Sequence, residues 1–156
     1  MIQIDIPGFG AVALKYAVFD YNGTLAFDGK MEVVTLKLLT QLQNHLQIRI
    51  LTADTFGLVR ETLQNYRFVV NILHGKWEAE QKDTYVEKLG AQQVIAFGNG
   101  NNDVLMLKKA RVGVAVIKEE GCSIKAISAA DVVVNNIDQG IQLLLNPLRL
   151  KASLRF

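Results

Sequence analysis

Between residues 16 and 145, short apolar runs alternate with segments in which apolar residues recur every three or four positions. The first pattern is typical of buried strands and the second of amphipathic helices. The predicted strands are 16–20, 48–52, 68–72, 94–97, 112–116 and 131–134. The predicted helices lie near 31–46, 55–65, 78–89, 102–109, 122–129 and 137–145. This alternation predicts an α/β protein, a Rossmann-like three-layer sandwich whose central parallel sheet is covered on both faces.

Two terminal segments stand outside the alternation. Isoleucines alternate with polar residues before Pro7-Gly8, which predicts an N-terminal β-hairpin. The last ten residues mix leucines with basic residues, a composition that we interpret as a frayed end or, less often, a docking strand. We expect a single domain without a cap, made of a hairpin (1–14), a core (15–146) and a tail (147–156).

Composition narrows the class of protein. Half of the 156 residues are apolar, 21% are charged and the formal net charge is +2, as in an ordinary globular domain. No dense stripe of Lys and Arg with interleaved aromatic residues is present, so we expect no nucleic-acid partner. No apolar stretch approaches the roughly 18 residues of a membrane span, and the first residues lack the features of a signal peptide. We therefore expect a cytoplasmic protein without a membrane partner.

Asp20 is the strongest candidate for chemistry. It ends an apolar strand and is followed at once by the Asn22-Gly23 turn and the hydroxyl of Thr24. Ligands of open α/β sheets bind at the carboxyl ends of strands, where a carboxylate can accept a phosphoryl group as a nucleophile. The alternative is that Asn22-Gly23 is only a hairpin turn. We expect the segment after Leu25 to be helical, which argues against a paired strand there.

Three further features lie at strand ends or helix starts. Thr52 could hold a phosphate oxygen or cap the next helix, and Asp54 could cap that helix or orient a site residue. Lys82 could neutralise an aspartate and a phosphate, or it could be a surface lysine. The Gly-Asn-Gly-Asn-Asn-Asp segment at 98–103 offers oxygen ligands suited to magnesium, or it could be a flexible loop.

Taken in order along the chain, these features resemble the haloacid dehalogenase superfamily of aspartate-nucleophile phosphohydrolases. Within it, the sequence is similar to the phosphorylation domain of P-type ATPases, especially to their small soluble relatives. The residues that carry the resemblance are Asp20, Thr24, Thr52, Lys82 and Asp103. The similarity spans residues 16 to about 134 and is densest from Lys82 to Val134.

The resemblance implies how the matching residues would work. Asp20 would attack phosphorus and form an aspartyl phosphate, while Lys82 would stabilise the transition state as a compact charge. The residues implied in catalysis are Asp20, Asn22, Thr52 and Lys82. The residues implied in substrate binding are Gly23, Thr24, Thr52, Ala53 and Lys82. The implied substrate carries its phosphate on a small molecule or on a protein.

Magnesium is the implied cofactor, because it would bridge the nucleophile and the phosphate and cancel the repulsion between two anions. The implied ligands are Asp20, the backbone carbonyl of Asn22, Asn99 and Asp103, the last directly or through water. The superfamily normally has Asp at the position of Asn99. The amide leaves the site with one negative charge fewer, so we expect weak magnesium binding.

Asn22 is a second departure from the superfamily pattern. Most of its phosphatases carry an Asp there, which protonates the leaving group and then activates water. An amide cannot do this at neutral pH, and a positioned acid or base is typically worth about 10²–10⁴-fold in rate. We therefore expect a slow phosphohydrolase. Two alternatives are a non-catalytic phosphate- or magnesium-binding regulatory module and a receiver-like switch phosphorylated on an aspartate, for which the upstream acidic pair is missing.

The spacing of the motifs leaves no room for an inserted domain. About 26 residues separate Leu25 from Thr52, and the predicted helix takes up most of them. Neither a mobile cap nor the nucleotide-binding domain of a P-type ATPase fits there, so we expect an open site. Because the cap is missing and the tail is apolar, we expect either a neighbouring subunit in a homo-oligomer or a bulky substrate to cover it.

Overall fold

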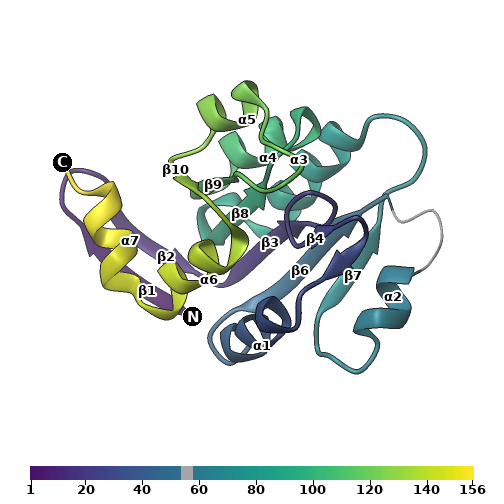
Figure 1. The fold of residues 1–156 in the computed structure, drawn as a ribbon. Helices are drawn as coiled ribbons and strands as arrows, with labels where there is room; N and C mark the ends of the chain where they lie inside the picture. Colours follow the sequence, from purple (N-terminus) through teal and green to yellow (C-terminus); the bar gives the residue numbers. More distant parts are fainter. Residues whose placement is uncertain (54–57) are drawn as a thin grey trace.

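A six-stranded parallel sheet forms the centre of the protein, in the strand order β10-β9-β8-β3-β6-β7 (Figure 1). The computed structural model describes residues 1–53 and 58–156. The strands are β3 (Tyr16–Asp20), β6 (Gln47–Thr52), β7 (Val69–Ile72), β8 (Val94–Gly98), β9 (Val112–Val116) and β10 (Val132–Val134). The chain builds the sheet outward from β3 in one direction and then in the other, so β3 lies at the point where the strand order reverses.

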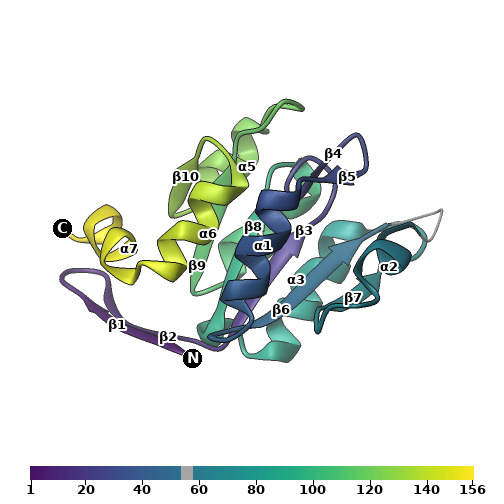
Figure 2. The ribbon, with the colours of Figure 1, turned by 60° about the horizontal axis from the view of Figure 1, so that its bottom comes forward.

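Helices cover both faces of this sheet (Figures 1 and 2). One face carries α1 (Val33–Leu42), α2 (Leu58–Leu63) and α6 (Ile137–Leu145), and the other carries α3 (Glu78–Leu89), α4 (Val104–Lys109) and α5 (Ile124–Ala129). Side chains along β3 alternate between the two cores, because successive residues of a strand point to opposite faces. Phe19 stacks on Phe97 of β8 in the first core, whereas Val18 belongs to the second. The predicted α/β class and the doubly covered parallel sheet are confirmed.

Most predicted elements lie where expected, with differences at their ends. The bounds of α3, α6 and β9 agree with the prediction. The helix predicted near 31–46 is shorter, and the one near 102–109 begins as a 3-10 turn, η2 (Asn101–Asp103). A second 3-10 turn, η1 (Ala91–Gln93), precedes β8. The start of the helix predicted near 55–65, together with Asp54, lies outside the described residues.

The predicted N-terminal hairpin is confirmed, but the prediction for the tail is wrong. Strands β1 (Ile2–Ile6) and β2 (Gly10–Leu14) pair antiparallel, and the tail forms a helix, α7 (Pro147–Leu154), instead of a frayed end or a strand. Leu150 and Leu154 are buried in the core that includes the hairpin. Their four-residue spacing gives the helix an apolar face, which covers the apolar face of the hairpin. Two of the tail leucines are therefore unavailable to a partner subunit.

The prediction for the segment after Leu25 is also wrong. Strands β4 (Ala26–Phe27) and β5 (Lys30–Met31) form a small antiparallel hairpin, which we call the flap, before α1 begins. Its turn is Asp28-Gly29, with φ angles of 48° and 73°. Asp-Gly is a preferred pair for such turns because both residues tolerate positive φ, so the signal was present in the sequence. The flap places a short exposed hairpin directly after the loop that contains Asn22, Gly23 and Thr24.

Within the described ranges, no helix is both long and apolar enough to cross a membrane.

Candidate active site

The parallel sheet brings the predicted strand-end residues to one edge. Asp20 at the end of β3 is in register with Leu51 of β6, so Thr52 lies one residue beyond it. On the other side, Phe19 is in register with Phe97 of β8, which places Gly98 and the following loop beside Asp20. The carboxyl ends of β6, β3 and β8 therefore meet around the Asp20 carboxylate, as expected for a ligand site at the reversal point of the sheet.

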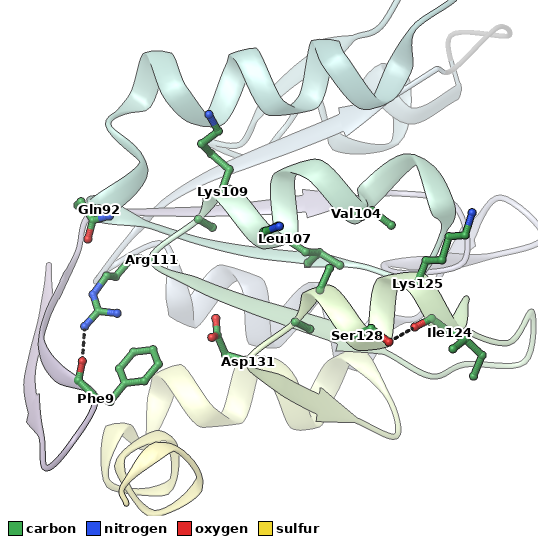
Figure 3. A pocket seen from close by; sticks show the side chains of 14 residues that line it. Phe9, Gln92, Val104, Leu107, Lys109, Arg111, Ile124, Lys125, Ser128 and Asp131 are labelled. Atoms are coloured by element: carbon green, nitrogen blue, oxygen red, sulfur yellow. Dashed lines mark hydrogen bonds between the residues drawn. The ribbon is translucent and has the colours of Figure 1, made fainter.

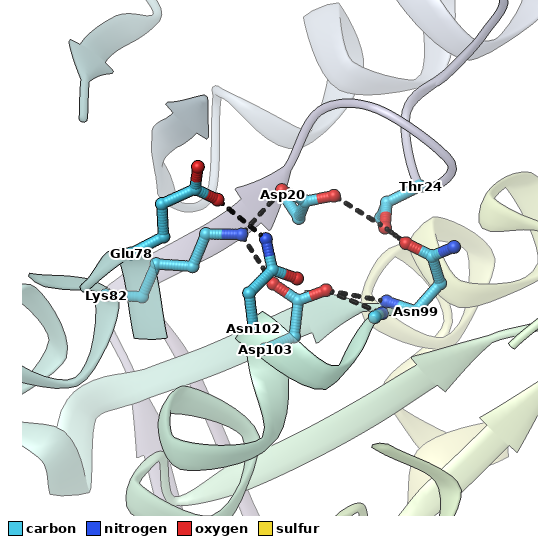
Figure 4. Close-up of polar contacts among 8 residues, drawn as sticks. Asp20, Thr24, Glu78, Lys82, Asn99, Asn102 and Asp103 are labelled. Carbon is cyan, nitrogen blue, oxygen red and sulfur yellow. Dashed lines mark hydrogen bonds and ion pairs between the residues drawn. The ribbon is translucent and has the colours of Figure 1, made fainter. Parts of the chain in front are cut away.

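Lys82 connects the two buried aspartates of the site. Its Nζ atom lies 2.7 Å from Oδ1 of Asp20 and 2.6 Å from Oδ1 of Asp103 (Figure 4). The side chain is only 1% exposed, which excludes the alternative that Lys82 is a surface lysine. Helix α3 starts at the carboxyl edge of the sheet, and Lys82 lies one turn after its first residue, Glu78. The start of this helix thus sets the position of the ammonium group.

The loop after β8 is built around the carboxylate of Asp103. Oδ2 of Asp103 accepts hydrogen bonds from the backbone N–H groups of Asn99 and Gly100, each at 2.9 Å. A Cβ atom on Gly98 would lie 2.5 Å from two carbon atoms of Asp103. The glycine is therefore needed for the close approach of strand and loop, and this segment is part of the site rather than an unstructured connection.

The loop after β3 places two further groups at the site. Thr24 is buried, and its hydroxyl can donate to Oδ2 of Asp20 at 3.4 Å or to Oδ1 of Asn99 at 3.3 Å (Figure 4). Gly23 has a φ of 75°, and a Cβ atom there would lie 2.5 Å from Nδ2 of Asn99. The loop therefore needs glycine to bring the Asp20 and Asn99 oxygens toward one point.

Thr52 has an unusual environment. Its side chain is 2% exposed, and among the described residues its Oγ1 atom has no hydrogen-bond partner. Buried hydroxyl groups almost always have a partner, so a partnerless one at a ligand edge suits a ligand oxygen. Asn22 and Ala53, the other predicted site residues, are exposed at the same edge. The structure thus places all the predicted site residues at one end of the sheet.

Burial and charge both affect the protonation of the site. Burial, together with the nearby Asp103 carboxylate, raises the pKa of Asp20 to about 7, although Lys82 opposes this shift. Burial alone would lower the pKa of Lys82, but the attraction of Asp20 and Asp103 outweighs it and the pKa is raised. Two carboxylates share one ammonium group in a region of low polarity. The site therefore favours the uptake of additional positive charge.

The residues present fit a magnesium ion through oxygen donors. Oδ2 of Asp20 and Oδ1 of Asn99 both face the Thr24 hydroxyl, and carboxylate and amide oxygens are the donor types that magnesium takes in proteins. Both carboxylate oxygens of Asp103 are already bonded to protein groups, which suits the predicted contact through water better than direct binding. Residues 1–53 and 58–156 contain no group of three or more His, Cys, Asp or Glu side chains arranged for a metal.

Two glutamates near the site were not predicted. Oε2 of Glu78 accepts a hydrogen bond of 2.9 Å from Nδ2 of Asn102 (Figure 4). Oε1 of Glu120 accepts one of 3.4 Å from the backbone N–H of Asp28 in the flap. Glu78 precedes Lys82 by four residues, and this helical spacing was a usable signal because it puts both on one face of α3. Glu120 comes near through a loop contact for which the sequence gives no signal.

A pocket of about 780 Å³ lies elsewhere, between the turn of the N-terminal hairpin and helices α4 and α5 (Figure 3). Phe9, Leu107, Arg111, Ile124 and Asp131 are among its lining residues. Its described lining includes none of the predicted site residues. The candidate chemistry therefore belongs to the carboxyl edge of the sheet and not to this pocket.

Comparisons with known proteins identify a matching family model and a related sequence. The family model of the haloacid dehalogenase-like hydrolases matches residues 31–145. An uncharacterised protein of Methanocaldococcus jannaschii is 50% identical over 64 residues, which cover 41% of this chain and 69% of that protein.

Solved structures of low sequence identity share the fold. A 3-deoxy-D-manno-octulosonate 8-phosphate phosphatase of Moraxella catarrhalis, in complex with magnesium, phosphate and its sugar, superposes with a TM-score of 0.68 at 17% identity. The match covers 85% of this chain and 86% of that one. The cobalt-bound phosphatase of this kind from Haemophilus influenzae gives a TM-score of 0.69 at 18% identity, covering 90% and 89% of the two chains.

Proposed function

This chain belongs to the family of haloacid dehalogenase-like hydrolases, and from that premise we propose that it is a magnesium-dependent phosphohydrolase with Asp20 as its nucleophile. The observation that carries the proposal is the shared ion pair of Lys82 with Asp20 and Asp103 at the carboxyl end of β3. Beside it lies the buried Thr52 hydroxyl, which has no partner in the described part of the chain. A nucleophile, a cation and a hydroxyl donor thus lie at the same edge of the sheet, which supports a phosphate site there.

The chain's own residues account for the first half of the reaction. An oxygen of the Asp20 carboxylate attacks phosphorus, the bond to the leaving oxygen breaks, and an aspartyl phosphate forms. When the attacking oxygen of Asp20 becomes bonded to phosphorus, Lys82 loses part of its interaction with that carboxylate. Its ammonium group then faces the transferred phosphoryl group. Thr24 and Thr52 donate hydrogen bonds to the phosphate oxygens. Gly23 lets the backbone of the loop approach them.

Magnesium, when bound, supplies positive charge that offsets the repulsion between the Asp20 carboxylate and the phosphate. Asp20 and Asn99 would hold it with the backbone carbonyl of Asn22, and Asp103 would act through water. Only one of the two side chains proposed for direct contact is a carboxylate, so we propose weak binding. A low-micromolar dissociation constant in a calorimetric titration would contradict this part.

The exposed residues Asn22 and Ala53 lie at the edge of the sheet where the site is, which supports the proposal of an open site without a cap. The substrate that suits it carries a terminal phosphate on a small molecule or on a protein. The phosphatase neighbours support a phosphate monoester. The similarity to the phosphorylation domain of P-type ATPases stays a prediction, and so does a homo-oligomer.

Hydrolysis of an aryl phosphate tests the proposal. We expect slow release of phosphate that requires magnesium and is lost in Asp20→Asn, because the amide is not a nucleophile. Binding of magnesium with beryllium fluoride, measured as a rise in melting temperature, reports on the site without turnover. If the ligand pair stabilises the protein but no substrate of a phosphate panel is hydrolysed, the protein is a binding module and the proposal fails.

A further inference from the structure

Hydrolysis of an aspartyl phosphate needs a group that takes a proton from the attacking water, and Asn22 cannot do this. We propose that Glu78 is the general base for this second step, an inference that rests on the proposed function. Its carboxylate takes one proton from water while the water oxygen attacks phosphorus. The bond between phosphorus and Asp20 breaks, its electron pair returns to the Asp20 carboxylate, and inorganic phosphate leaves. Glu78 then releases its proton to solvent.

Glu78 has the position that this role requires. It is the first residue of α3 and lies one helical turn, about 5.4 Å along the axis, before Lys82. Because α3 starts at the carboxyl edge of the sheet, Glu78 lies farther out from the sheet than Lys82. Figure 4 shows its carboxylate on the same side of the Lys82 stem as Asp20. Water must reach phosphorus from the side opposite Asp20, which is the outer side.

The Glu78 carboxylate is both held in place and available. Oε2 accepts the 2.9 Å hydrogen bond from Asn102, the residue that directly precedes Asp103. In the described part of the chain, Oε1 has no hydrogen bond, and Glu78 forms no ion pair with Lys82. The side chain is half-buried. One oxygen is therefore fixed and the other is free to accept a proton.

The other carboxylates near the site are committed to different contacts. Asp20 is the nucleophile itself. Asp103 has Lys82 on one oxygen and two backbone N–H groups on the other. Glu120 lies in an exposed turn, where it bonds to the backbone of the flap at 3.4 Å. In the described part of the chain Glu120 also has one bonded and one unbonded oxygen, but its side chain is exposed and its hydrogen bond is longer than the 2.9 Å bond from Asn102 to Glu78. Glu78 is therefore the better anchored of the two glutamates.

Glu78→Gln tests the assignment, because glutamine can keep the hydrogen bond from Asn102 but cannot accept a proton. Steady-state release of phosphate from an aryl phosphate should fall at least about a hundredfold, the low end for loss of a general base. Formation of the phosphoenzyme should continue, so the acid-trapped fraction phosphorylated on Asp20 should rise. A melting curve verifies the fold. Asn22→Asp added to Glu78→Gln should restore turnover, because it supplies the carboxylate that most phosphatases of the superfamily use as acid and base.

Glu80→Gln is the matched control. It removes the same charge from the same turn of α3, but Glu80 is exposed and lines a different pocket with Trp77 and Tyr85. Turnover should stay at the wild-type rate. The assignment is overturned if Glu78→Gln turns over within twofold of wild type. It is also overturned if formation of the phosphoenzyme falls as much as turnover, which would show a positioning role.

The proposed function fails in a different way. In that case the wild-type protein itself gives neither Asp20-dependent release of phosphate nor a trapped phosphoenzyme. The inference about Glu78 then falls with it, whatever the Glu78 variant does.

Discussion

Lys82 shows how strongly one buried side chain can depend on its neighbours. Its ammonium group has been removed from water, which is costly unless opposite charges surround it. Asp20 and Asp103 supply those charges at 2.7 and 2.6 Å. The same three groups that we assign to chemistry therefore also affect the stability of the protein.

Replacing Lys82 by Met should destabilise the protein strongly. The substitution leaves two buried carboxylates without their cation, and breaking a buried ion pair in this way typically costs about 3–5 kcal/mol. Urea unfolding without magnesium measures the effect. Lys88→Met, an exposed position on the same helix, should change the free energy of unfolding by less than about 0.5 kcal/mol. Similar effects at both positions would contradict the description of Lys82.

The raised pKa of Asp20 predicts a pH-dependent stability of the metal-free protein. The folded state favours the protonated form of Asp20, because the pKa is about 7 there and 3.8 for an unperturbed aspartate, as in the unfolded chain. The stabilising contribution is complete below pH 3.8 and is lost as the pH rises through 7. The Asp20→Asn side chain cannot ionise. The melting temperature of this variant in EDTA, relative to that of the wild type, should therefore rise from pH 5 to pH 8. Asp5→Asn, at an exposed hairpin position, should show no such trend.

Among the secondary-structure elements, β9 and α4 pack with unusually little space. A Cβ atom on Gly113 would lie 2.4 Å from the carbonyl oxygen of Leu107, a backbone atom that cannot move away as a side chain can. The flap, in contrast to this contact between two elements, is determined by a strong local signal in the sequence. Asp28 and Gly29 form its turn because both tolerate positive φ, six residues after the similar Asn22-Gly23 pair.

Gly113→Ala should destabilise the protein by roughly 1–3 kcal/mol, the usual cost of inserting an extra methyl group into a packed region. The midpoint of chemical unfolding is the measurement. Alanine also reduces the entropy of the unfolded chain, so an effect near zero or a gain in stability would show that α4 can shift away from β9 without cost.

For the molecule as a whole, the two ends of the chain form one substructure. Helix α7 packs on the N-terminal hairpin, and the backbone N–H of Phe156 donates to the carbonyl oxygen of Pro7 at 3.1 Å. Figures 1 and 2 show this unit beside the main sheet, next to α6. The ends of the sequence thus stabilise one another far from the site.

Leu150→Ala should lower the free energy of unfolding by about 2–5 kcal/mol, because the Leu150 side chain of α7 is fully buried in the core that includes the hairpin. Leu148→Ala is the control, since Leu148 is 78% exposed on the same helix and should have little effect. Thermal unfolding of both variants measures the difference. Equal and small effects would mean that α7 does not hold the hairpin in solution.

Sequence patterns were sufficient for the elements whose signals are local. Periodicity placed α3, α6 and β9 at their observed bounds, and the order of strands and helices determined the α/β class. The strand-end positions of Asp20 and Thr52 followed from the same patterns, because the carboxyl ends of parallel strands share one edge.

Only the tertiary structure decided what depends on contacts between distant segments. Lys82 has no local signal that distinguishes it from a surface lysine, and its burial results from two aspartates 62 and 21 residues away. The tail became a helix because its leucines met the hairpin, and Glu78 became a candidate base because Asn102 holds it. Propensity and periodicity act within a few residues, whereas burial and pairing of charges depend on which segments the fold brings together.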